Sequence, residues 1–555
     1  MPIPHTFILI KGQPKALQIE SFRQEDYGAY TVKFKTSART YHYKSCDVVW
    51  LKDSVSHDHL LNKVFIGGQE QKNVADIYSF AQGAKTHWRI IYSNGYAQDY
   101  LDGSITLLES CLADDVVRNS FEYLKDVAKI NELGKDEDHG GFLSNLYDKV
   151  DFIDSAQAAA PYLNNTKYKV HKFKSSSLIY PFGCNSSQEK AVTAAFENQI
   201  SVIQGPPGTG KTQTILNIIA NIILEGKTVI VVSNNNSATA NVLEKLQKYN
   251  LGFIVAALGN NKNKERFLEN QPVVPQELQS WNLDKTDGVD PKEDVNAILE
   301  KLKTSFNLQE ELALLKQENK NIEIEWEHYK QDNNISDDTY TVKSGIKSSR
   351  FMNLWLHYQA YAEGDIIGPK GFFCRLKERI KWCWMNFIRK YLLGIKAPFD
   401  TKNLKPIIME LQSLFYLVRL QELRNRITAI KGELKLLEAK KLSESLTSLS
   451  MEILKDCLYE KYNGNNHTVF RNLRHLSVSS GVVCQQYPVI LSTTFSARKA
   501  LYNTVYDYII MDEASQVSVE TGALALTCAK NAVIVGDALQ LPNVVKEEDK
   551  LKLNA

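Results

Sequence analysis

The stretch Gly205-Pro-Pro-Gly-Thr-Gly210-Lys211-Thr212 decides the fold of this chain. It fits the pattern G-x-x-x-x-G-K-[ST], follows the apolar run Ile200 to Gln204 and precedes a helical pattern from Thr214 to Leu224. A strand, a glycine-rich loop and a helix in this order are typical of the phosphate-binding loop of nucleotide-binding proteins. The sequence therefore predicts an α/β domain with this loop at the carboxyl end of a buried strand.

Each residue type in this loop has a use in binding ATP with Mg²⁺. Glycines let main-chain N–H groups surround phosphate oxygens, and Lys211 places a cation beside the β and γ phosphates. The Thr212 hydroxyl, at the N-terminus of the helix, is predicted to bind Mg²⁺. The predicted nucleotide-binding residues of the loop are Gly205, Pro206, Pro207, Gly208, Thr209, Gly210, Lys211 and Thr212.

Five apolar runs predict the strands of a parallel sheet. They are continuous rather than alternating, as expected for strands that are buried on both faces. The runs are Ile200 to Ile203, Thr228 to Val232, Val489 to Leu491, Tyr508 to Met511 and Ala532 to Val535. A turn with polar or glycine residues follows each run, and ligands of open α/β sheets bind outside the carboxyl ends of the strands.

Two of these turns carry side chains that suit ATP hydrolysis. Asp512 can hold Mg²⁺, while Glu513 can orient and deprotonate the attacking water. Gln540, in Gly536-Asp-Ala-Leu-Gln540-Leu-Pro542, can hydrogen-bond a γ-phosphate or the attacking water. Gly-Asp and Leu-Pro are also turn formers, so the second string taken alone predicts only a turn.

Together these strings resemble a known family. Asn185-Ser-Ser-Gln188, Gly205 to Thr212, Asp512-Glu-Ala-Ser-Gln516 and Gly536 to Pro542 are similar, in this order, to the Q motif and motifs I, II and III of superfamily 1B helicases related to the eukaryotic nonsense-mediated-decay helicase. The resemblance covers about residues 180 to 260 and 485 to 545, roughly a quarter of the chain. It implies the first RecA-like ATP-binding lobe of a helicase-type motor.

The resemblance also implies roles by position. Gln188 would contact the adenine edge, and Gln540 the γ-phosphate. Ser233-Asn234-Asn235-Asn236-Ser237-Ala238 is similar to motif Ia, and Ser492-Thr493-Thr494 to motif Ic; in the family both contact the backbone of single-stranded nucleic acid. The predicted nucleic-acid contacts are Ser233, Asn234, Asn235, Thr493 and Thr494.

The motif Ia assignment has a departure and an alternative. The family usually has proline where this chain has Asn234, and asparagine-rich turns need no ligand. A larger departure concerns the second RecA-like lobe, whose arginines reach the γ-phosphate in the family. We do not expect this lobe within the sequence. Ala555 follows Pro542 too closely for such a lobe, so we expect ATP binding with weak hydrolysis unless further sequence or another chain supplies it.

The remaining sequence predicts two further regions. Residues 1–165 predict an auxiliary α+β domain, with short strands followed by apolar positions at helical spacing from about Ile105 to Leu133. Residues 166–265 and 471–555 would form the ATPase lobe, interrupted by a helical insertion at 266–470. Two of its segments resemble a coiled coil, the second with a clean alternating three-four spacing of apolar positions, and they predict an antiparallel stalk. They contain Leu308, Leu312, Leu315 and Ile322, and Leu420, Leu423, Ile427, Ile430, Leu434 and Leu437.

At the expected tip of this stalk, Lys370 to Phe399 mixes basic and aromatic residues. These could contact the phosphates and bases of a nucleic acid. The alternatives are an amphipathic helix that buries its aromatic rings, or a helix lying on a membrane surface.

Composition narrows the class of protein. Hydrophobic residues make up 43% and charged residues 23%, and Lys plus Arg exceed Asp plus Glu by only 66 to 64. No global charge therefore attracts nucleic acid, and any basic surface must be local. The eight cysteines show no CxxC pair, and no apolar stretch of about 18 residues predicts a membrane span. We expect a cytoplasmic protein without a membrane partner.

Three functions remain open at this stage. The first is an ATP-dependent helicase or translocase lobe with single-stranded DNA or RNA as partner. The second is a nucleotide-gated binding protein in which ATP sets the position of the stalk without unwinding. The third, an ATPase of the chromosome-cohesion type, requires a Leu-Ser-Gly-Gly string, from which Leu476-Ser-Val-Ser-Ser-Gly481 departs.

Overall fold

The computed structural model describes most of the chain, in two compact units. The described residues are 5–132, 142–171, 178–234, 236–283, 291–336, 340, 345–362, 380, 383–384, 387–392, 395–398, 403–465, 467–502 and 504–540. Unit 1 comprises Met1–Asp284 and Glu452–Ala555, and unit 2 comprises Lys285–Met451. Within the described ranges, no helix is both long and apolar enough to cross a lipid bilayer.

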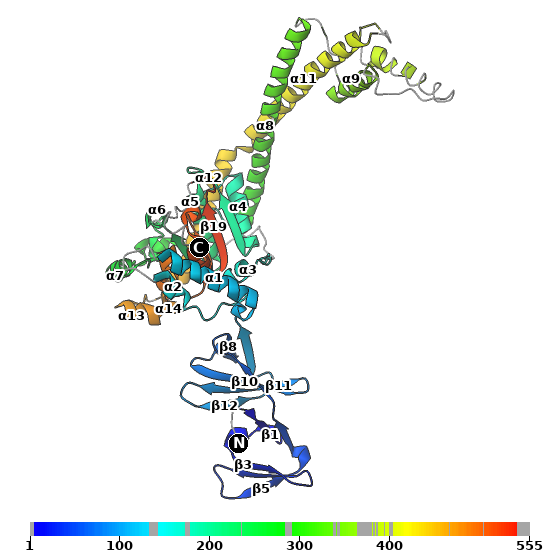
Figure 1. Cartoon of the computed structure of the whole chain (residues 1–555). Helices are drawn as coiled ribbons and strands as arrows, with labels where there is room; N and C mark the ends of the chain where they lie inside the picture. Colours follow the sequence, from blue (N-terminus) through cyan, green and yellow to red (C-terminus); the bar gives the residue numbers. More distant parts are fainter. Residues whose placement is uncertain are drawn as a thin grey trace. The chain divides into compact units, whose positions relative to one another are not determined.

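Unit 1 begins with antiparallel strands (Figure 1). They pair in the orders β2-β1-β6, β3-β4-β5, β12-β11-β10-β7 and β13-β8-β9. Their bounds are β1 (Phe7–Ile10), β2 (Gln13–Pro14), β3 (Ile19–Gln24), β4 (Tyr30–Phe34), β5 (Thr40–Tyr43), β6 (Val48–Leu51), β7 (Ser54–His57), β8 (Asn62–Ile66), β9 (Gln69–Glu70), β10 (Val74–Gln82), β11 (Lys85–Tyr92), β12 (Ala97–Tyr100) and β13 (Ile105–Glu109).

The helix predicted from about Ile105 starts later than its apolar spacing indicates. Ile105–Glu109 form β13, which pairs with β8 from Ile105 opposite Ile66 to Glu109 opposite Asn62. The helix α1 (Asp115–Glu132) follows, and the Asp114 carboxylate accepts a hydrogen bond from Val116 N in its first turn. Pairing with a distant strand therefore outweighs the local helical spacing. Two short helices come next, α2 (Phe142–Tyr147) and α3 (Ala159–Leu163).

A six-stranded parallel sheet forms the centre of the ATPase lobe and confirms the predicted parallel sheet. Its order is β14-β19-β18-β15-β17-β16, with every pairing in the parallel sense. The strands are β14 (Ile200–Gln204), β15 (Val229–Ser233), β16 (Val255–Ala257), β17 (Val489–Thr493), β18 (Tyr506–Met511) and β19 (Ala529–Gly536). The edge strand β16 was not among the five predicted strands.

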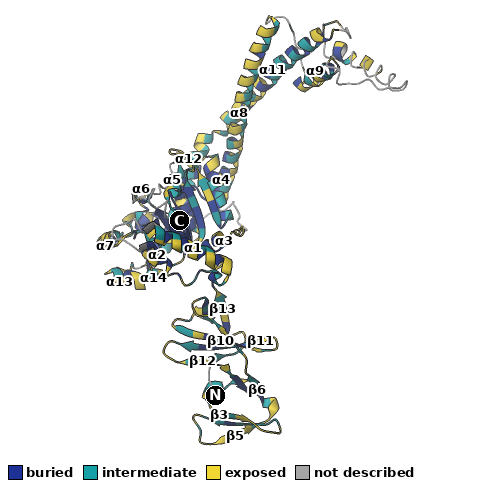
Figure 2. Cartoon of the chain, viewed as in Figure 1, coloured by how far each residue is buried: buried dark blue, intermediate teal, exposed yellow. Residues whose placement is uncertain are grey.

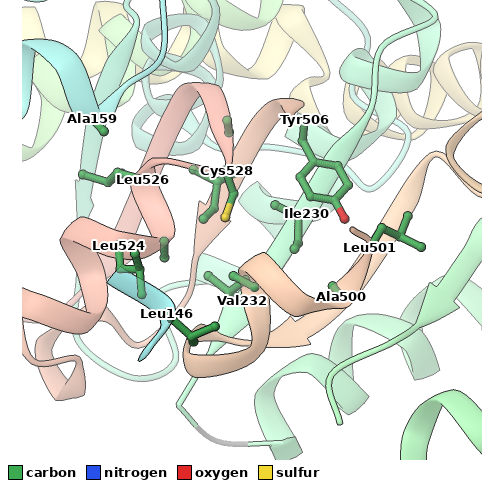
Figure 3. Packing of buried hydrophobic residues seen from close by; sticks show 14 of the residues in the cluster. Leu146, Ala159, Ile230, Val232, Ala500, Leu501, Tyr506, Leu524, Leu526 and Cys528 are labelled. Atoms are coloured by element: carbon green, nitrogen blue, oxygen red, sulfur yellow. The ribbon is translucent and has the colours of Figure 1, made fainter. Parts of the chain in front are cut away.

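Helices cover this sheet, and its central strands are buried (Figure 2). The helices are α4 (Ser186–Glu197), α5 (Lys211–Leu224), α6 (Asn236–Lys248), α7 (Asn261–Glu269), α13 (Leu473–Val478), α14 (Ser480–Gln486), α15 (Ala497–Ala500) and α16 (Val519–Leu526). One core cluster joins Ile230 and Val232 of β15 to Leu524 of α16 and to Leu146 and Ala159 of the preceding helices (Figure 3). The segment before the lobe therefore shares the core of the lobe.

Unit 2 is helical. Its elements are α8 (Pro291–Asn333), α9 (Ser348–Ala362), η8 (Ile388–Leu392) and α11 (Lys405–Leu437), together with the start of α12 (Ala439–Tyr462). The helices α8 and α11 contact each other through ion pairs such as Arg419 to Glu318 at 2.6 Å. Leu423 and Ile430 of α11 are buried there. A supercoil between the two helices stays a prediction.

Unit 2 is shorter than the predicted insertion at 266–470. The flanking residues belong to unit 1 because their side chains pack against the lobe. The ring of Phe267 lies 5.1 Å from that of Tyr487, and the ring of Tyr462 lies 5.1 Å from that of Phe253, measured between ring centroids. The Gln271 side chain accepts a hydrogen bond from Phe470 N at 2.9 Å.

Candidate active site

The glycine-rich loop joins β14 to α5 in a conformation that its glycines make possible. Gly208 and Gly210 have φ of +86° and +85°, in the left-handed region that side chains disfavour. A Cβ on Gly210 would also collide with the Gln188 amide, and one on Gly205 would lie 2.7 Å from Thr209 Oγ1. The loop therefore needs glycine at these places, and Thr212 lies half-buried in the first turn of α5.

Lys211 brings the loop and the acidic strand end together. Its Nζ donates a hydrogen bond to Gly205 O at 2.9 Å and lies 3.8 Å from Glu513 Oε1. The strands that precede these residues in the chain, β14 and β18, belong to one sheet and are separated by β19 alone. The sequence predicted both elements separately, and the structure places them at the same carboxyl edge.

Asp512 is a buried carboxylate at the end of β18. It is 7% exposed, its N–H donates to Val232 O at 2.8 Å, and its Oδ1 accepts a hydrogen bond from Glu513 N at 3.0 Å. Burial raises the pKa of Asp512 above its ordinary value, and the neighbouring Glu513 charge adds to this, while that hydrogen bond, Lys211 and Lys245 oppose it. A cation bound here would stabilise the charged carboxylate.

Glu513 has two unusual features. Its φ is +53°, which is uncommon for a residue with a side chain and costs about 1–3 kcal/mol. Its Oε2 is buried and has no hydrogen-bond partner, although Oε1 faces Lys211. Strained backbone and unpaired buried oxygens are concentrated at functional sites because ligands complete them.

These residues fit a magnesium nucleotide. Mg²⁺ binds oxygen donors, usually one or two carboxylates with hydroxyls, waters and phosphate oxygens. Asp512 offers a buried carboxylate, Glu513 an oxygen without a partner and Thr212 a hydroxyl at the start of α5. Side chains at Gly205 and Gly210 would collide with Thr209 and Gln188, so the loop keeps its path only with glycine at these two places. The donor set and the loop thus agree with the predicted ligands.

Gln188 braces the glycine loop from α4. With Asn185 it forms a capping box at the helix N-terminus, in which Gln188 Oε1 accepts from Asn185 N at 2.9 Å. Its Nε2 donates to Gly210 O at 3.3 Å and to Gln213 Oε1 at 3.2 Å. The Gln188 amide is therefore already held next to the loop, and its contact with adenine stays a prediction.

Gln540 follows the strand that lies between β14 and β18 in the sheet, β19. This strand is joined to the loop by a hydrogen bond from Gly205 N to Gly536 O at 3.2 Å. The chain turns here, because Gln540 N donates to Asp537 O at 3.1 Å and Leu539 N to Asp537 Oδ1 at 3.0 Å. The turn interpretation therefore describes the backbone, while the half-buried Gln540 side chain keeps its predicted role as a proposal. Pro542 lies outside the described residues.

The predicted nucleic-acid contacts meet at the ends of two adjacent strands. Ser233 of β15 pairs in register with Thr493 of β17. Ser233 is fully buried, and Thr494 is buried with an unpaired Oγ1. Thr493 Oγ1 accepts from Ser496 N at 3.3 Å. Asn234 donates to Gln516 O at 2.6 Å, and Asn235 lies outside the described residues.

Sequence reasoning missed two lysines near this edge. Lys264 of α7 donates through Nζ to Lys499 O in α15, a few residues after Thr493. Burial, and then the charge of Lys499, lower the pKa of Lys264. The apolar run Phe253 to Leu258, followed by Gly259, was the signal for β16 and for the helix that carries Lys264. The helices that follow β16 and β17, α7 and α15, thus each place a lysine near this edge.

Most of the basic and aromatic segment Lys370 to Phe399 lies outside the described residues. Within its described part, Trp384 and Phe387 are 62% and 47% exposed, with ring centroids 6.0 Å apart. Arg389 is buried and donates to Ala397 O. Burial of the aromatic rings, one of the three interpretations, does not hold for these two side chains.

Fold and site together define a P-loop nucleotide-binding protein of the α/β class. A sequence family described as an AAA domain matches residues 183–362 and 402–548, more than half of the chain, and the chain belongs to this family.

Curated relatives match shorter stretches of the chain. A DNA polymerase alpha-associated DNA helicase A of Schizosaccharomyces pombe is 41% identical over 63 residues, 11% of this chain and 10% of the relative. A regulator of nonsense transcripts 1 homolog of Drosophila melanogaster is 44% identical over 68 residues, 12% of this chain and 6% of the relative. A DNA-binding protein SMUBP-2 of Mesocricetus auratus is 35% identical over 69 residues, which are 12% of this chain and 7% of the relative.

The matches thus span a tenth or less of the length of these relatives. The family and the names of the relatives support a superfamily 1 helicase-like nucleotide-binding domain, of the kind that uses a nucleotide and usually Mg²⁺.

Proposed function

We propose that this chain binds ATP with Mg²⁺ and hydrolyses it in response to single-stranded nucleic acid, as the first lobe of a superfamily 1 helicase or translocase. The observation that carries the proposal is the distance of 3.8 Å between Lys211 Nζ and Glu513 Oε1. It brings the phosphate-binding cation and the carboxylate for water activation, 302 positions apart in sequence, to one point.

The residues would divide the chemistry as follows. Lys211 and the main-chain N–H groups of the loop bind the phosphates and stabilise their charge. Glu513 orients a water molecule and accepts its proton as the water oxygen bonds to the γ-phosphorus and the bond to the β–γ bridging oxygen breaks. Gln540, in the turn after β19, hydrogen-bonds the γ-phosphate. Asp512 and Thr212 would hold Mg²⁺, which supplies positive charge to the phosphate oxygens.

We further propose that full turnover needs a second RecA-like lobe, from other sequence or another chain. An arginine that reaches the γ-phosphate is worth about 10³ to 10⁵ in rate. The lobe by itself would then bind ATP well and hydrolyse it slowly. Addition of the separate second lobe should raise turnover without a comparable change in nucleotide affinity.

Calorimetric titration with a non-hydrolysable ATP analogue in Mg²⁺ tests the nucleotide site. Lys211→Ala should weaken binding by at least about 100-fold, because a cation next to the phosphates is lost. Lys227→Ala is the matched control, because Lys227 pairs with Glu225 at 2.6 Å and lies at the amino end of β15. Equal affinity of the Lys211→Ala variant and the unchanged protein would exclude this site.

Single-stranded oligonucleotides test the second part of the proposal. Unlabelled DNA and RNA strands, each added to saturation, should raise the rate of phosphate release. A protein that binds the ATP analogue but shows neither oligonucleotide binding nor stimulation would instead be a nucleotide-gated binding protein with a helical arm.

A further inference from the structure

The short turn after Glu513 is held from two sides. This turn, η10 (Ala514–Gln516), begins at the left-handed Glu513 and closes with a hydrogen bond from Gln516 N to Glu513 O at 3.0 Å. Its first residues pack on Gly536 of β19, where a Cβ would lie 3.2 Å from Ser515 N and 3.3 Å from Ala514 N. Any displacement of the turn would therefore move Glu513.

Asn234 holds the other side of the turn. It follows β15 directly, in the loop predicted to contact nucleic acid, and its Nδ2 donates to Gln516 O at 2.6 Å. The two residues are 282 positions apart in sequence. The bond thus joins a side chain of that loop to the turn that positions Glu513.

The polar atoms around this bond are incompletely paired. Asn234 Oδ1, Ser515 Oγ and Glu513 Oε2 are all buried and have no hydrogen-bond partner. A buried polar atom without a partner costs about 1–3 kcal/mol. An arrangement with several such atoms is stabilised less than one that satisfies them, so a modest ligand-driven shift of the turn is energetically accessible.

We propose that Asn234 is a positioning residue that couples the two ligand sites of the proposed function. Nucleic acid bound at the loop after β15 shifts Asn234, and the bond to Gln516 O transmits this shift through the turn to Glu513. The inference rests on the proposed function and adds its regulation. Because coupling between binding sites is reciprocal, bound nucleotide must change nucleic-acid affinity by the same factor.

The test measures that factor directly. Fluorescence anisotropy gives the Kd of a single-stranded RNA and of a single-stranded DNA of equal length, with and without a saturating non-hydrolysable ATP analogue. In the unchanged protein, the Kd values measured with and without the analogue should differ by about 5-fold or more for at least one of the two strands. In Asn234→Ala the ratio should approach one, while the Kd for the analogue alone stays within about twofold.

Two further variants separate coupling from general damage. Asn234→Asp keeps the size of the side chain but has no donor for Gln516 O, so it should lose the coupling as well. Asn270→Ala is the matched control: Asn270 Nδ2 also donates to a main-chain oxygen, Arg266 O at 3.3 Å, but within α7 and away from the turn. This control should keep the full ratio.

The possible outcomes point in different directions. An unchanged ratio in both Asn234 variants, or no ratio above one in the unchanged protein, would overturn the coupling. With either result, the proposed nucleotide site would still hold if Lys211→Ala weakens binding of the analogue by at least about 100-fold. Loss of the ratio in Asn270→Ala as well would also count against a specific role of Asn234.

Discussion

The two ends of the six-stranded sheet differ in how their carboxylates are satisfied. At the amino ends, the Asp507 carboxylate accepts hydrogen bonds from Thr228 N, Thr228 Oγ1 and Lys530 Nζ, all at 3.0 Å. Gln199 there donates to Ala156 O at 3.0 Å and to Lys530 O at 3.2 Å. At the carboxyl ends, Glu513 Oε2 is buried without a partner, and so are Asn234 Oδ1, Thr494 Oγ1 and Ser515 Oγ; toward the amino ends, Ser201 Oγ and Tyr506 OH also lack partners.

This difference separates the stabilising edge from the ligand-binding edge. Buried polar atoms in folded proteins are nearly always paired, so a group of unpaired ones marks a place where something else completes the structure. The same edge holds the glycine loop and the left-handed Glu513. We expect substitutions at the carboxyl ends to change ligand chemistry and substitutions at the amino ends to change stability.

Replacement of Glu513 by glutamine should have the largest effect. Glutamine keeps the shape of the side chain but cannot accept the proton of the attacking water, so turnover should fall by about 10² to 10⁴. Affinity for the ATP analogue should be retained, which phosphate-release assays and calorimetry would show together. Glu265→Gln, on the exposed side of α7, should have normal turnover. Full turnover in Glu513→Gln would remove this residue from the mechanism.

Substitution of Gly536 by alanine tests whether the turn after Glu513 must stay in place. The new Cβ would press on Ser515 N and Ala514 N at 3.2 and 3.3 Å, so turnover should fall by about 10-fold and stability by about 1–3 kcal/mol. Gly432→Ala in α11 is the matched control, because its Cβ meets no atom within 4 Å and alanine favours a helix by up to about 1 kcal/mol. Urea denaturation and steady-state turnover measure both variants; an active Gly536→Ala would mean that the turn adapts freely.

At the amino ends, Asp507→Asn should destabilise the protein without affecting the ligand site. The charge-assisted bonds to Lys530 and Thr228 are weakened, which should cost about 1–3 kcal/mol in urea denaturation. Nucleotide affinity should stay within about twofold of its normal value. A large loss of affinity with unchanged stability would reverse the distinction between the two edges.

The smallest expected effect is the pH dependence of the same contact. Burial by itself would raise the pKa of Asp507, but the Lys530 charge and the Thr228 donors outweigh it and hold the pKa below its ordinary value. The carboxylate therefore stabilises the fold above the unfolded pKa of about 3.9, and this contribution disappears as the pH falls through the lower folded pKa. The stability difference between the protein and Asp507→Asn should thus be present at neutral pH and shrink below about pH 4. A difference that grows on acidification would contradict this sign.

Part of the candidate site could be predicted because the residues with these chemical roles occur in short contiguous strings. The glycines, Lys211 and the Asp512-Glu513 pair each sit in one short string with a defined chemical use. The contacts between such strings could not be predicted, because their partners are far apart in the chain. Gln188 at the loop and Asn234 at Gln516 O are examples, and in both cases the side chain contacts main-chain oxygens that carry no sequence signal.

The sequence by itself determined the phosphate-binding loop and the buried strands that carry the site, since continuous apolar runs and glycine positions express local requirements. Only the tertiary structure decided that Ile105–Glu109 form a strand, that Val255–Ala257 complete the sheet and that Lys211 faces Glu513. The reason is physical: strand pairing and side-chain proximity depend on free energies between distant segments, which local periodicity does not contain.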